Sequence, residues 1–386
     1  MRTFKYAIVG GGAATATAAE AIRGRDGDGS LAIFTREWAP PYQRPPLSKE
    51  YLQNRAPLLD ALMFPASWYL EKNIELHGGL EVLRVDPMRK RLETNGGEVG
   101  YERLLLATGA APRTLKIPGA DLDGVYTLRS YLDAERLRGV RASAQRVVLI
   151  GSGFIGMEVA ASLRGGGCDV TVVEITGSLY ARFGAEVSAY AKSLFDNHGV
   201  ETIFNTSVVS IEGRERVTGV TLSDGRQIQA NAVVVGVGAA PDVALAQAAG
   251  LRVDDGIVVD DRLRTSTADI YAAGDVARFP GAAGRPIRVE HFDNAYASGA
   301  TAGANMTGAD ERYAYVPFFW SDVFELSFEF VGDPGPDSKI VQGALESGSF
   351  VVEYRDRDGL RGALLAQRTP EERDAYRNSL AAASGA

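Results

Sequence analysis

Cysteine and histidine are both scarce in this chain. Cys168 is the single cysteine among 386 residues, so an internal disulfide, a Cys-x-x-Cys dithiol and a cysteine-ligated iron cluster cannot form. This absence excludes the disulfide reductases as a function class. The three histidines, His77, His198 and His291, lie far apart and lack the spacing of metal ligands. We therefore predict no metal site, and we interpret Cys168 as a small residue near the start of a strand.

Basic clusters and long apolar runs are also missing. The chain has 49 acidic and 41 basic residues, a formal net charge of -8 and no basic block, which argues against nucleic acid or an anionic membrane as partner. No run of 18 apolar residues occurs, so we expect no transmembrane helix and a cytoplasmic location. The length and the 45% hydrophobic content suit a soluble protein of two or three domains that binds a small molecule.

A complete βαβ nucleotide-binding unit is present in residues 146–174, RVVLIGSGFIGMEVAASLRGGGCDVTVVE. Gly151 allows a sharp turn off the first strand, Gly153 allows the backbone to approach a pyrophosphate, and Gly156 lets the helix pack close to the sheet. The phosphates would bind at the helix N-terminus. Glu174, at the tip of the second strand, can accept hydrogen bonds from ribose hydroxyls and would repel a 2′-phosphate. This pattern predicts NADH rather than NADPH.

A second unit of this kind begins at the N-terminus. An apolar strand at 4–9 runs into three glycines at 10–12, and a strongly helix-forming run follows at 13–22. Thr15 replaces the third glycine of the fingerprint and should push the helix slightly off the strand. Glu37 follows the next strand, where an acidic residue can hold an adenosine ribose. The internal repeat predicts two bound dinucleotides.

The segment PPYQRPPLSKEYL, residues 40–52, contains four prolines. Proline fixes φ, so we expect a stiff loop that continues to a helix capped by Ser48. Arg44 and Lys49 present two cations beside a nucleotide fold, which suits phosphate and a reduced, anionic ring. A rigid surface loop without a ligand is the alternative interpretation.

The remaining segments indicate three domains. YERLLLATGAAPR at 101–113 and NAVVVGVGAAPD at 231–242 each combine an apolar strand with small residues, which indicates a duplicated architecture. IYAAGDVA at 270–277 supplies a strand, a glycine turn and Asp275, and we expect its helix to complete the first domain rather than the second. From about residue 317 the sequence is rich in aromatic residues and in segments typical of β-strands, which indicates a third domain.

The expected fold class is therefore α/β, with two Rossmann-like three-layer nucleotide-binding domains, one inserted in the other, and a C-terminal α+β domain. The first domain is expected to be discontinuous, and the second lies within it. The predicted boundaries are 1–114 with 243–316 for the first domain, 115–242 for the second and 317–386 for the third.

These motifs, together with EHFDNAYASGATAGANMTG and FFWSD, resemble the FAD-dependent pyridine-nucleotide reductases of the ferredoxin-reductase type over essentially the whole chain. That family includes putidaredoxin and rubredoxin reductases, the reductases of bacterial aromatic-ring dioxygenases, and apoptosis-inducing factor. The resemblance implies that the first domain binds FAD, with Glu37 on the adenosine ribose and Asp275 on the ribityl chain. It places Arg44 and Lys49 near the phosphates and the ring.

The resemblance also implies NADH in the second domain, with Glu174 on its ribose and Arg182 close to its adenosine half. It pairs Glu158 with Lys49 near flavin N5, where the lysine stabilises electron density on the ring and the glutamate keeps the lysine charged and positioned. Two unrelated surface charges are the alternative. Phe154 would cover the flavin until nicotinamide displaces it, and apolar helix packing is the rival interpretation of this side chain.

The residues with expected roles fall into two groups. Those expected to take part in catalysis are Lys49, Phe154, Glu158 and Trp320. Those expected to bind the cofactors lie in the glycine turns, at strand ends and at helix starts: Gly10, Gly12, Ala13, Ala14, Glu37, Arg44, Lys49, Val82, Ala107, Thr108, Gly109, Gly151, Gly153, Phe154, Ile155, Gly156, Glu158, Glu174, Arg182, Gly238, Gly274, Asp275, His291 and Trp320.

The resemblance implies an enzyme that takes a hydride from NADH onto FAD and passes electrons to a small iron–sulfur protein of the ferredoxin or rubredoxin type. His291, Trp320 and the segment GANMTG are closer to the apoptosis-inducing factor branch, which leaves the electron acceptor open. One alternative is an NADH oxidase or a quinone or small-radical reductase. Another is a redox-sensing interaction module that changes its oligomeric state when NADH binds. A homodimer is possible in each case.

Overall fold

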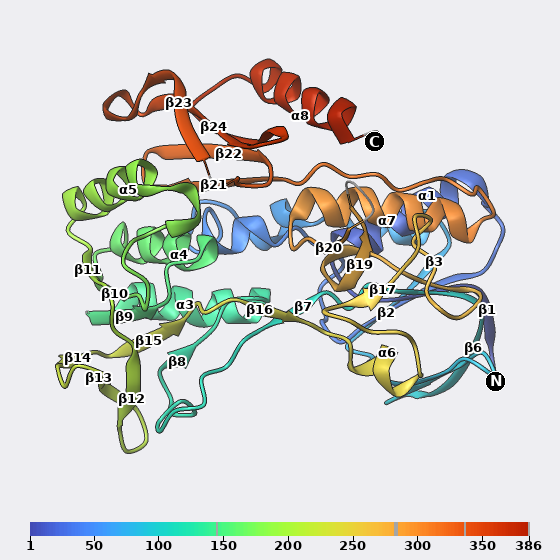
Figure 1. Cartoon of the computed structure of the whole chain (residues 1–386). Coiled ribbons are helices and arrows are strands. Elements are labelled where there is room, and N and C mark those ends of the chain that lie inside the picture. Colours follow the sequence, from blue (N-terminus) through green and yellow to red (C-terminus); the bar gives the residue numbers. More distant parts are fainter. Residues whose placement is uncertain (144–145, 282–284, 336, 385–386) are drawn as a thin grey trace.

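The structure, a computed structural model, describes residues 1–143, 146–281, 285–335 and 337–384. Two sheets with flanking helices lie side by side, one mainly parallel and the other parallel throughout, and an antiparallel sheet with the C-terminal helix lies across one face of both (Figure 1). The predicted α/β fold class is confirmed. In the described part of the chain, no helix is long and apolar enough to cross a membrane.

The first sheet has the order β3-β2-β1-β6-β5-β4. Strand β18 pairs with residues 104–106 of β6, on the side of β6 that faces away from β1. The central parallel segments are mostly apolar and buried, namely β2, β18, the second half of β1 and the last three residues of β6, which suits strands that are covered on both faces. The parallel strands are β1 (Thr3–Val9), β2 (Leu31–Thr35), β3 (Ile74–Gly78), β6 (Gly97–Leu106) and β18 (Ile270–Ala272). The antiparallel strands are β4 (Val82–Asp86) and β5 (Arg91–Thr94).

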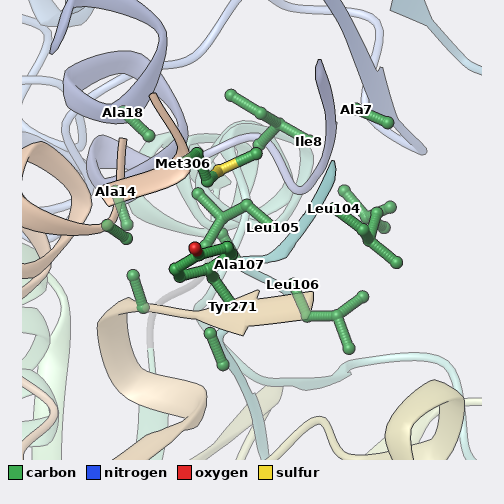
Figure 2. Packing of buried hydrophobic residues seen from close by; sticks show 14 of the residues in the cluster. Ala7, Ile8, Ala14, Ala18, Leu104, Leu105, Leu106, Ala107, Tyr271 and Met306 are labelled. Atoms are coloured by element: carbon green, nitrogen blue, oxygen red, sulfur yellow. The ribbon is translucent and has the colours of Figure 1, made fainter. Parts of the chain in front are cut away.

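Helices α1 (Ala13–Arg25) and α7 (Phe292–Met306) cover one face of this sheet in close mutual contact. Glycine makes this approach possible: a Cβ on Gly299 would lie 2.4 Å from the Ala14 carbonyl oxygen, and one on Gly303 would lie 2.4 Å from that of Ala18. Figure 2 shows Ala14, Ala18 and Met306 meeting the side chains of β6 and β18 in the core between helices and sheet. The first unit is therefore completed by elements that lie far apart in the chain, at residues 13–25 and 292–306.

The second sheet is parallel, with the order β11-β10-β9-β15-β8. Helix α4 begins directly after the second glycine turn. The strands and helices of this unit are β8 (Val125–Tyr126), α3 (Tyr131–Ser143), β9 (Arg146–Ile150), α4 (Phe154–Arg164), β10 (Asp169–Val173), η3 (Ala181–Phe183), α5 (Ala185–Asn197), β11 (Glu201–Ile203) and β15 (Ala232–Val235). A small antiparallel sheet adds to it: β12 (Val208–Gly213), β13 (Val217–Leu222) and β14 (Gln227–Gln229).

The chain passes between the two units twice, through β7 (Ala110–Pro112) and β16 (Ala239–Pro241), which pair antiparallel. The chain then returns to the first unit through short elements. These are α6 (Ala244–Ala248), β17 (Ile257–Val258), η4 (Gly274–Val276), β19 (Ala277–Pro280) and β20 (Pro286–Arg288). The helix expected directly after Asp275 is therefore displaced, because β19 and β20 come first and α7 begins at Phe292.

The C-terminal sheet has the order β21-β22-β25-β24-β23 and is antiparallel throughout. Its aromatic face packs onto the second unit, where Phe319, Phe330 and Tyr354 share one core with Phe183. The elements are β21 (Phe318–Val323), β22 (Leu326–Gly332), β23 (Asp337–Ala344), η6 (Leu345–Ser347), β24 (Ser349–Asp356), β25 (Gly359–Ala366) and α8 (Pro370–Ser384).

The proline-rich loop differs from its prediction. It forms the short 3₁₀ helix η1 (Pro45–Ser48), followed by turns, and no α-helix begins at Ser48. The Ser48 hydroxyl instead donates a hydrogen bond to Glu158, 110 residues later in the chain. The next elements are η2 (Leu58–Ala61) and α2 (Ala66–Glu71). The propensity of serine for helix N-caps was outweighed here by a long-range carboxylate partner.

Candidate functional site

A cavity of about 1820 Å³ opens where the first sheet, the start of α4 and β21 meet. Most of the residues proposed from sequence line it. They are Gly10, Gly12, Ala13, Ala14, Glu37, Arg44, Lys49, Val82, Ala107, Thr108, Gly109, Gly153, Phe154, Ile155, Gly156, Glu158, Arg182, Gly238, Gly274, Asp275, His291 and Trp320. Gly151 and Glu174 do not line the cavity.

The first glycine turn leaves the start of α1 open to the cavity. Gly10 has φ +150°, and a Cβ there would lie 2.3 Å from the Ala107 carbonyl oxygen, so this position requires glycine. Gly12 is the N-cap residue of α1, without a side-chain cap, and a Cβ on it would meet no atom within 4 Å. Residues 10–14 line the cavity, so the N-terminus of the helix, which is its positive end, opens onto it, and this arrangement fits a diphosphate.

A chain of charged groups runs along the wall next to this turn. Glu37 accepts hydrogen bonds from the Tyr42 hydroxyl at 2.5 Å and from Arg44 Nη2 at 2.8 Å. Arg44 also donates to the backbone carbonyl of Arg129. Arg129 in turn donates to Asp275 Oδ2 at 2.7 Å. The predicted residues Glu37, Arg44 and Asp275 are thus joined into one network.

Arg129 was missed by the sequence analysis. It lies in the segment that follows β8, and its ion-pair partner Asp275 comes 146 residues later. No motif or spacing in the sequence links the two residues. The pair connects the second unit to the η4 turn of the first unit and lines the cavity between them.

The structure brings Lys49 and Glu158 together in a buried cluster. Lys49 Nζ lies 3.4 Å from Glu158 Oε1 and 2.9 Å from Asp322 Oδ2. The Glu158 oxygens also accept hydrogen bonds from two hydroxyls, that of Ser48 at 2.5 Å and that of Ser321 at 2.6 Å. The side chains of Lys49 and Glu158 are 6% and 7% exposed, so the alternative of two unrelated surface charges is wrong. Ser48, Ser321 and Asp322 were not predicted, since each lies in a different segment from Glu158.

Burial and charge oppose each other in this cluster. Burial lowers the pKa of the Lys49 ammonium, but Glu158 and Asp322 outweigh it and hold that pKa above its ordinary value. Burial raises the pKa of Glu158, and the opposing effects of Lys49, Ser321 and Ser48 do not cancel the increase. Lys49 therefore stays protonated at neutral pH, while Glu158 is more readily protonated than an exposed glutamate.

Aromatic side chains surround the mouth of this cluster. Phe154, at the start of α4, packs against Phe319 with ring centroids 4.5 Å apart and against Tyr180 at 5.5 Å, and it also lines the cavity. The Lys49 ammonium lies 5.6 Å from the centroid of the Trp320 ring. Phe154 thus has both features considered for it, apolar packing on one side and the cavity on the other.

His291 precedes α7 and lies beside Phe319, with ring centroids 4.9 Å apart. Burial lowers the pKa of its imidazole to about 4, so the ring is neutral at pH 7. Its Nδ1 atom is buried and has no hydrogen-bond partner among the described residues. An unpaired buried nitrogen at a cavity wall provides a hydrogen-bonding position for a bound group.

The second glycine turn explains why two predicted residues lie outside the cavity. Gly151 has φ +95°, and a Cβ there would lie 2.7 Å from the Gly236 carbonyl oxygen. Glu174 accepts hydrogen bonds from the backbone N–H of Ser152 at 2.7 Å and of Thr176 at 2.8 Å. Burial alone would raise the pKa of Glu174. The hydrogen bonds from Ser152 and Thr176 together have the larger, opposite effect, so the pKa lies below its ordinary value. The carboxylate is therefore charged and holds the turn, and each oxygen has a free lone pair.

In the described part of the chain, no group of three or more His, Cys, Asp or Glu residues is placed to hold a metal ion. Cys168 is buried, as its interpretation as a structural residue requires, and burial raises the pKa of its thiol.

Comparison with known proteins identifies the family. The family model described as pyridine nucleotide-disulphide oxidoreductase matches residues 4–299. Rhodocoxin reductase of Rhodococcus erythropolis is 40% identical, over 89% of this chain and 82% of its own length. The reductase component of an anthranilate 1,2-dioxygenase system from Burkholderia cepacia is 36% identical, over 98% and 94%.

Among solved structures, putidaredoxin reductase in its covalent complex with putidaredoxin superposes with a TM-score of 0.92 at 31% identity. The superposition covers 100% of this chain and 94% of that chain. The match therefore includes the C-terminal sheet as well as the two nucleotide-binding units. The chain belongs to the pyridine nucleotide-disulphide oxidoreductase family, and within it to the ferredoxin, rubredoxin and putidaredoxin reductase type.

Proposed function

We propose that this protein is an FAD-dependent reductase that takes a hydride from NADH and delivers electrons to a small iron–sulfur protein of the ferredoxin or rubredoxin type. Membership of the family implies binding of FAD and NAD(P). The observation that carries the proposal is that one cavity is lined both by the two glycine turns and by the buried Lys49–Glu158 pair. Relatives named as ferredoxin and rubredoxin reductases support the acceptor class.

The first unit has the groups that FAD requires. The open N-terminus of α1 would take the diphosphate, Glu37 and Arg44 would hold the adenosine half, and Asp275 would hold the ribityl chain. FAD, when bound, supplies hydride acceptance and one-electron transfer, which no side chain of this protein provides. Lys49 would hold a positive charge close to the ring, and Glu158 and Asp322 would fix the position of that charge.

The proposed preference for NADH rests on Glu174. The carboxylate is charged, because two backbone amides hold its pKa down, and it stands at the end of β10 beside the second glycine turn. A 2′-phosphate at this place would meet a negative charge. Ile175 and Thr176 follow in the chain and provide no cation that could receive it.

The test is rapid mixing of the FAD-loaded protein with NADH or NADPH under anaerobic conditions, monitored by flavin absorbance. We expect bleaching by NADH with a specificity constant well above that for NADPH. The reduced protein is then mixed with ferredoxin, rubredoxin, a quinone or oxygen, and reoxidation by one of the iron–sulfur proteins should be fastest. Faster reoxidation by quinone or oxygen would make the protein an oxidase or quinone reductase. Slow reoxidation by all four would favour a redox-sensing module.

A further inference from the structure

Strand β21 contributes to the buried cluster through both of its faces. Successive side chains on a strand point to opposite sides, and residues 320–323 follow this alternation. Ser321 is fully buried and donates a hydrogen bond to Glu158 at 2.6 Å. Trp320 and Asp322, on the other face, both contact the Lys49 ammonium. Within one short segment of β21, Ser321 thus contacts Glu158, while its two neighbours contact Lys49.

The geometry favours Asp322 over Glu158 as the nearest anion to Lys49. The Asp322 oxygen is 2.9 Å from Nζ, and the Glu158 oxygen is 3.4 Å away. Glu158 also shares its two oxygens with the hydroxyls of Ser48 and Ser321. The Asp322 side chain is 39% exposed, whereas that of Glu158 is 7% exposed, so a carboxylate at position 322 has the smaller desolvation cost.

We infer that Asp322 is a positioning residue for Lys49: it is the nearest counter-ion, and it holds the ammonium at the wall of the cavity. Glu158, fixed by two serine hydroxyls, forms the buried side of the same site. The inference rests on the proposed function only for its kinetic part, because the Lys49–Asp322 contact is made between residues of this chain alone.

The first measurement is a double-mutant cycle on the full-length protein as purified, at matched FAD content. The variants are Lys49→Met, Asp322→Asn and the combination, and unfolding by urea is the readout. We expect a coupling between the two positions equal to about a three- to fivefold change in the unfolding equilibrium constant, which is the upper range for a partly exposed ion pair. Glu346→Gln, which removes an exposed carboxylate elsewhere in the C-terminal segment, is the charge-matched control.

The second measurement is the rate of flavin reduction at saturating NADH, in variants matched for FAD content. Asp322→Asn should slow reduction by about three- to tenfold, since the ammonium is less well held, and Asp322→Glu should recover most of the rate. In a Lys49→Met background, Asp322→Asn should have no further effect. A residue that only stabilises the fold would give neither the rescue by glutamate nor this dependence on Lys49.

Two results would overturn the inference: a coupling no larger than that between Lys49→Met and Glu346→Gln, or a rate loss in Asp322→Asn that persists in the Lys49→Met background. The two proposals fail separately. If NADH does not reduce the flavin of the parent protein, the proposed function is wrong, and the unfolding cycle still decides whether Asp322 holds Lys49.

Discussion

Replacement of Lys49 by methionine tests the centre of the site. The substitution keeps the length and apolar stem of the side chain and removes its charge. At an effective dielectric constant of about 20, a charge pair 3.4 Å apart, the distance to Glu158, has a gross attraction of about 5 kcal/mol. Desolvation offsets part of this attraction, and the raised pKa of Glu158 allows this carboxyl to neutralise itself once the lysine is gone. We therefore expect a net loss of about 2–4 kcal/mol in the free energy of unfolding.

Glu158→Gln should be milder, with a loss of about 1 kcal/mol, because the amide can still bond the hydroxyls of Ser48 and Ser321, and Lys49 keeps Asp322. The Lys49→Met, Glu158→Gln double variant should lose less than the sum of the two. Lys192→Met is the matched control. It removes a half-exposed lysine that pairs with Asp196 at 2.5 Å, and it should change the stability by less than about 0.5 kcal/mol.

The kinetic assay follows flavin bleaching after rapid mixing with NADH, in protein whose FAD content has been measured first. Loss of a positive charge next to developing negative charge costs a few kcal/mol of barrier, so Lys49→Met should reduce its flavin about a hundredfold more slowly. Equal rates in flavin-replete Lys49→Met and the parent would refute the electrostatic role. Equal unfolding curves would refute the stability estimate.

Three further predictions concern other positions. Burial lowers the pKa of His291 to about 4, so the unfolded state binds more protons than the folded state below about pH 6.5. The free energy of unfolding should therefore fall by about 2 kcal/mol from pH 7.5 to pH 5. His291→Gln should remove this part of the pH dependence, as measured by urea titrations at each pH. Glu174→Gln should raise the NADPH-to-NADH ratio of kcat/KM at least about tenfold in steady-state assays. Gly303→Val should cost about 3 kcal/mol in chemical denaturation, because its Cβ would lie 2.4 Å from the Ala18 carbonyl, whereas Gly139→Ala, in an open helix position, should not destabilise the protein.

The features that sequence predicted well depend on local backbone requirements. Gly10 and Gly151 both have a positive φ, which favours glycine whatever surrounds the turn, so the two turns can be recognised without tertiary information. The parallel strands follow from their apolar runs. The segment IYAAGDVA was expected to supply the missing last piece of the first domain, and its strand β18 does pair with β6.

The features that sequence missed depend on contacts between distant segments. Asp322 ends the motif FFWSD, but nothing in that motif points to Lys49, and Arg129 belongs to no motif. Their partners come from distant segments, at the end of the η1 loop and in the η4 turn. Ser48 was expected to cap a helix, but a carboxylate on α4 takes its hydroxyl. The position of Glu174 was predicted, whereas its hydrogen bonds to the turn were not, because backbone amides leave no trace in the residue pattern.

The close contact of α1 with α7, and the pairing of β18 with β6, set an order for folding during synthesis. All five strands of the second sheet lie between residues 125 and 235, so this unit can assemble as soon as that stretch has left the ribosome. The first sheet begins at residue 3 but obtains its last strand at residue 272 and its second helix at residue 306. Until then, one side of β6 has no neighbour along residues 104–106, and the alanine-rich face of α1 is uncovered. The nascent chain therefore exposes a strand edge from the end of β6 at residue 106 until β18 is complete at residue 272, and a ribosome stall in this interval would leave that edge available to chaperones or to aggregation.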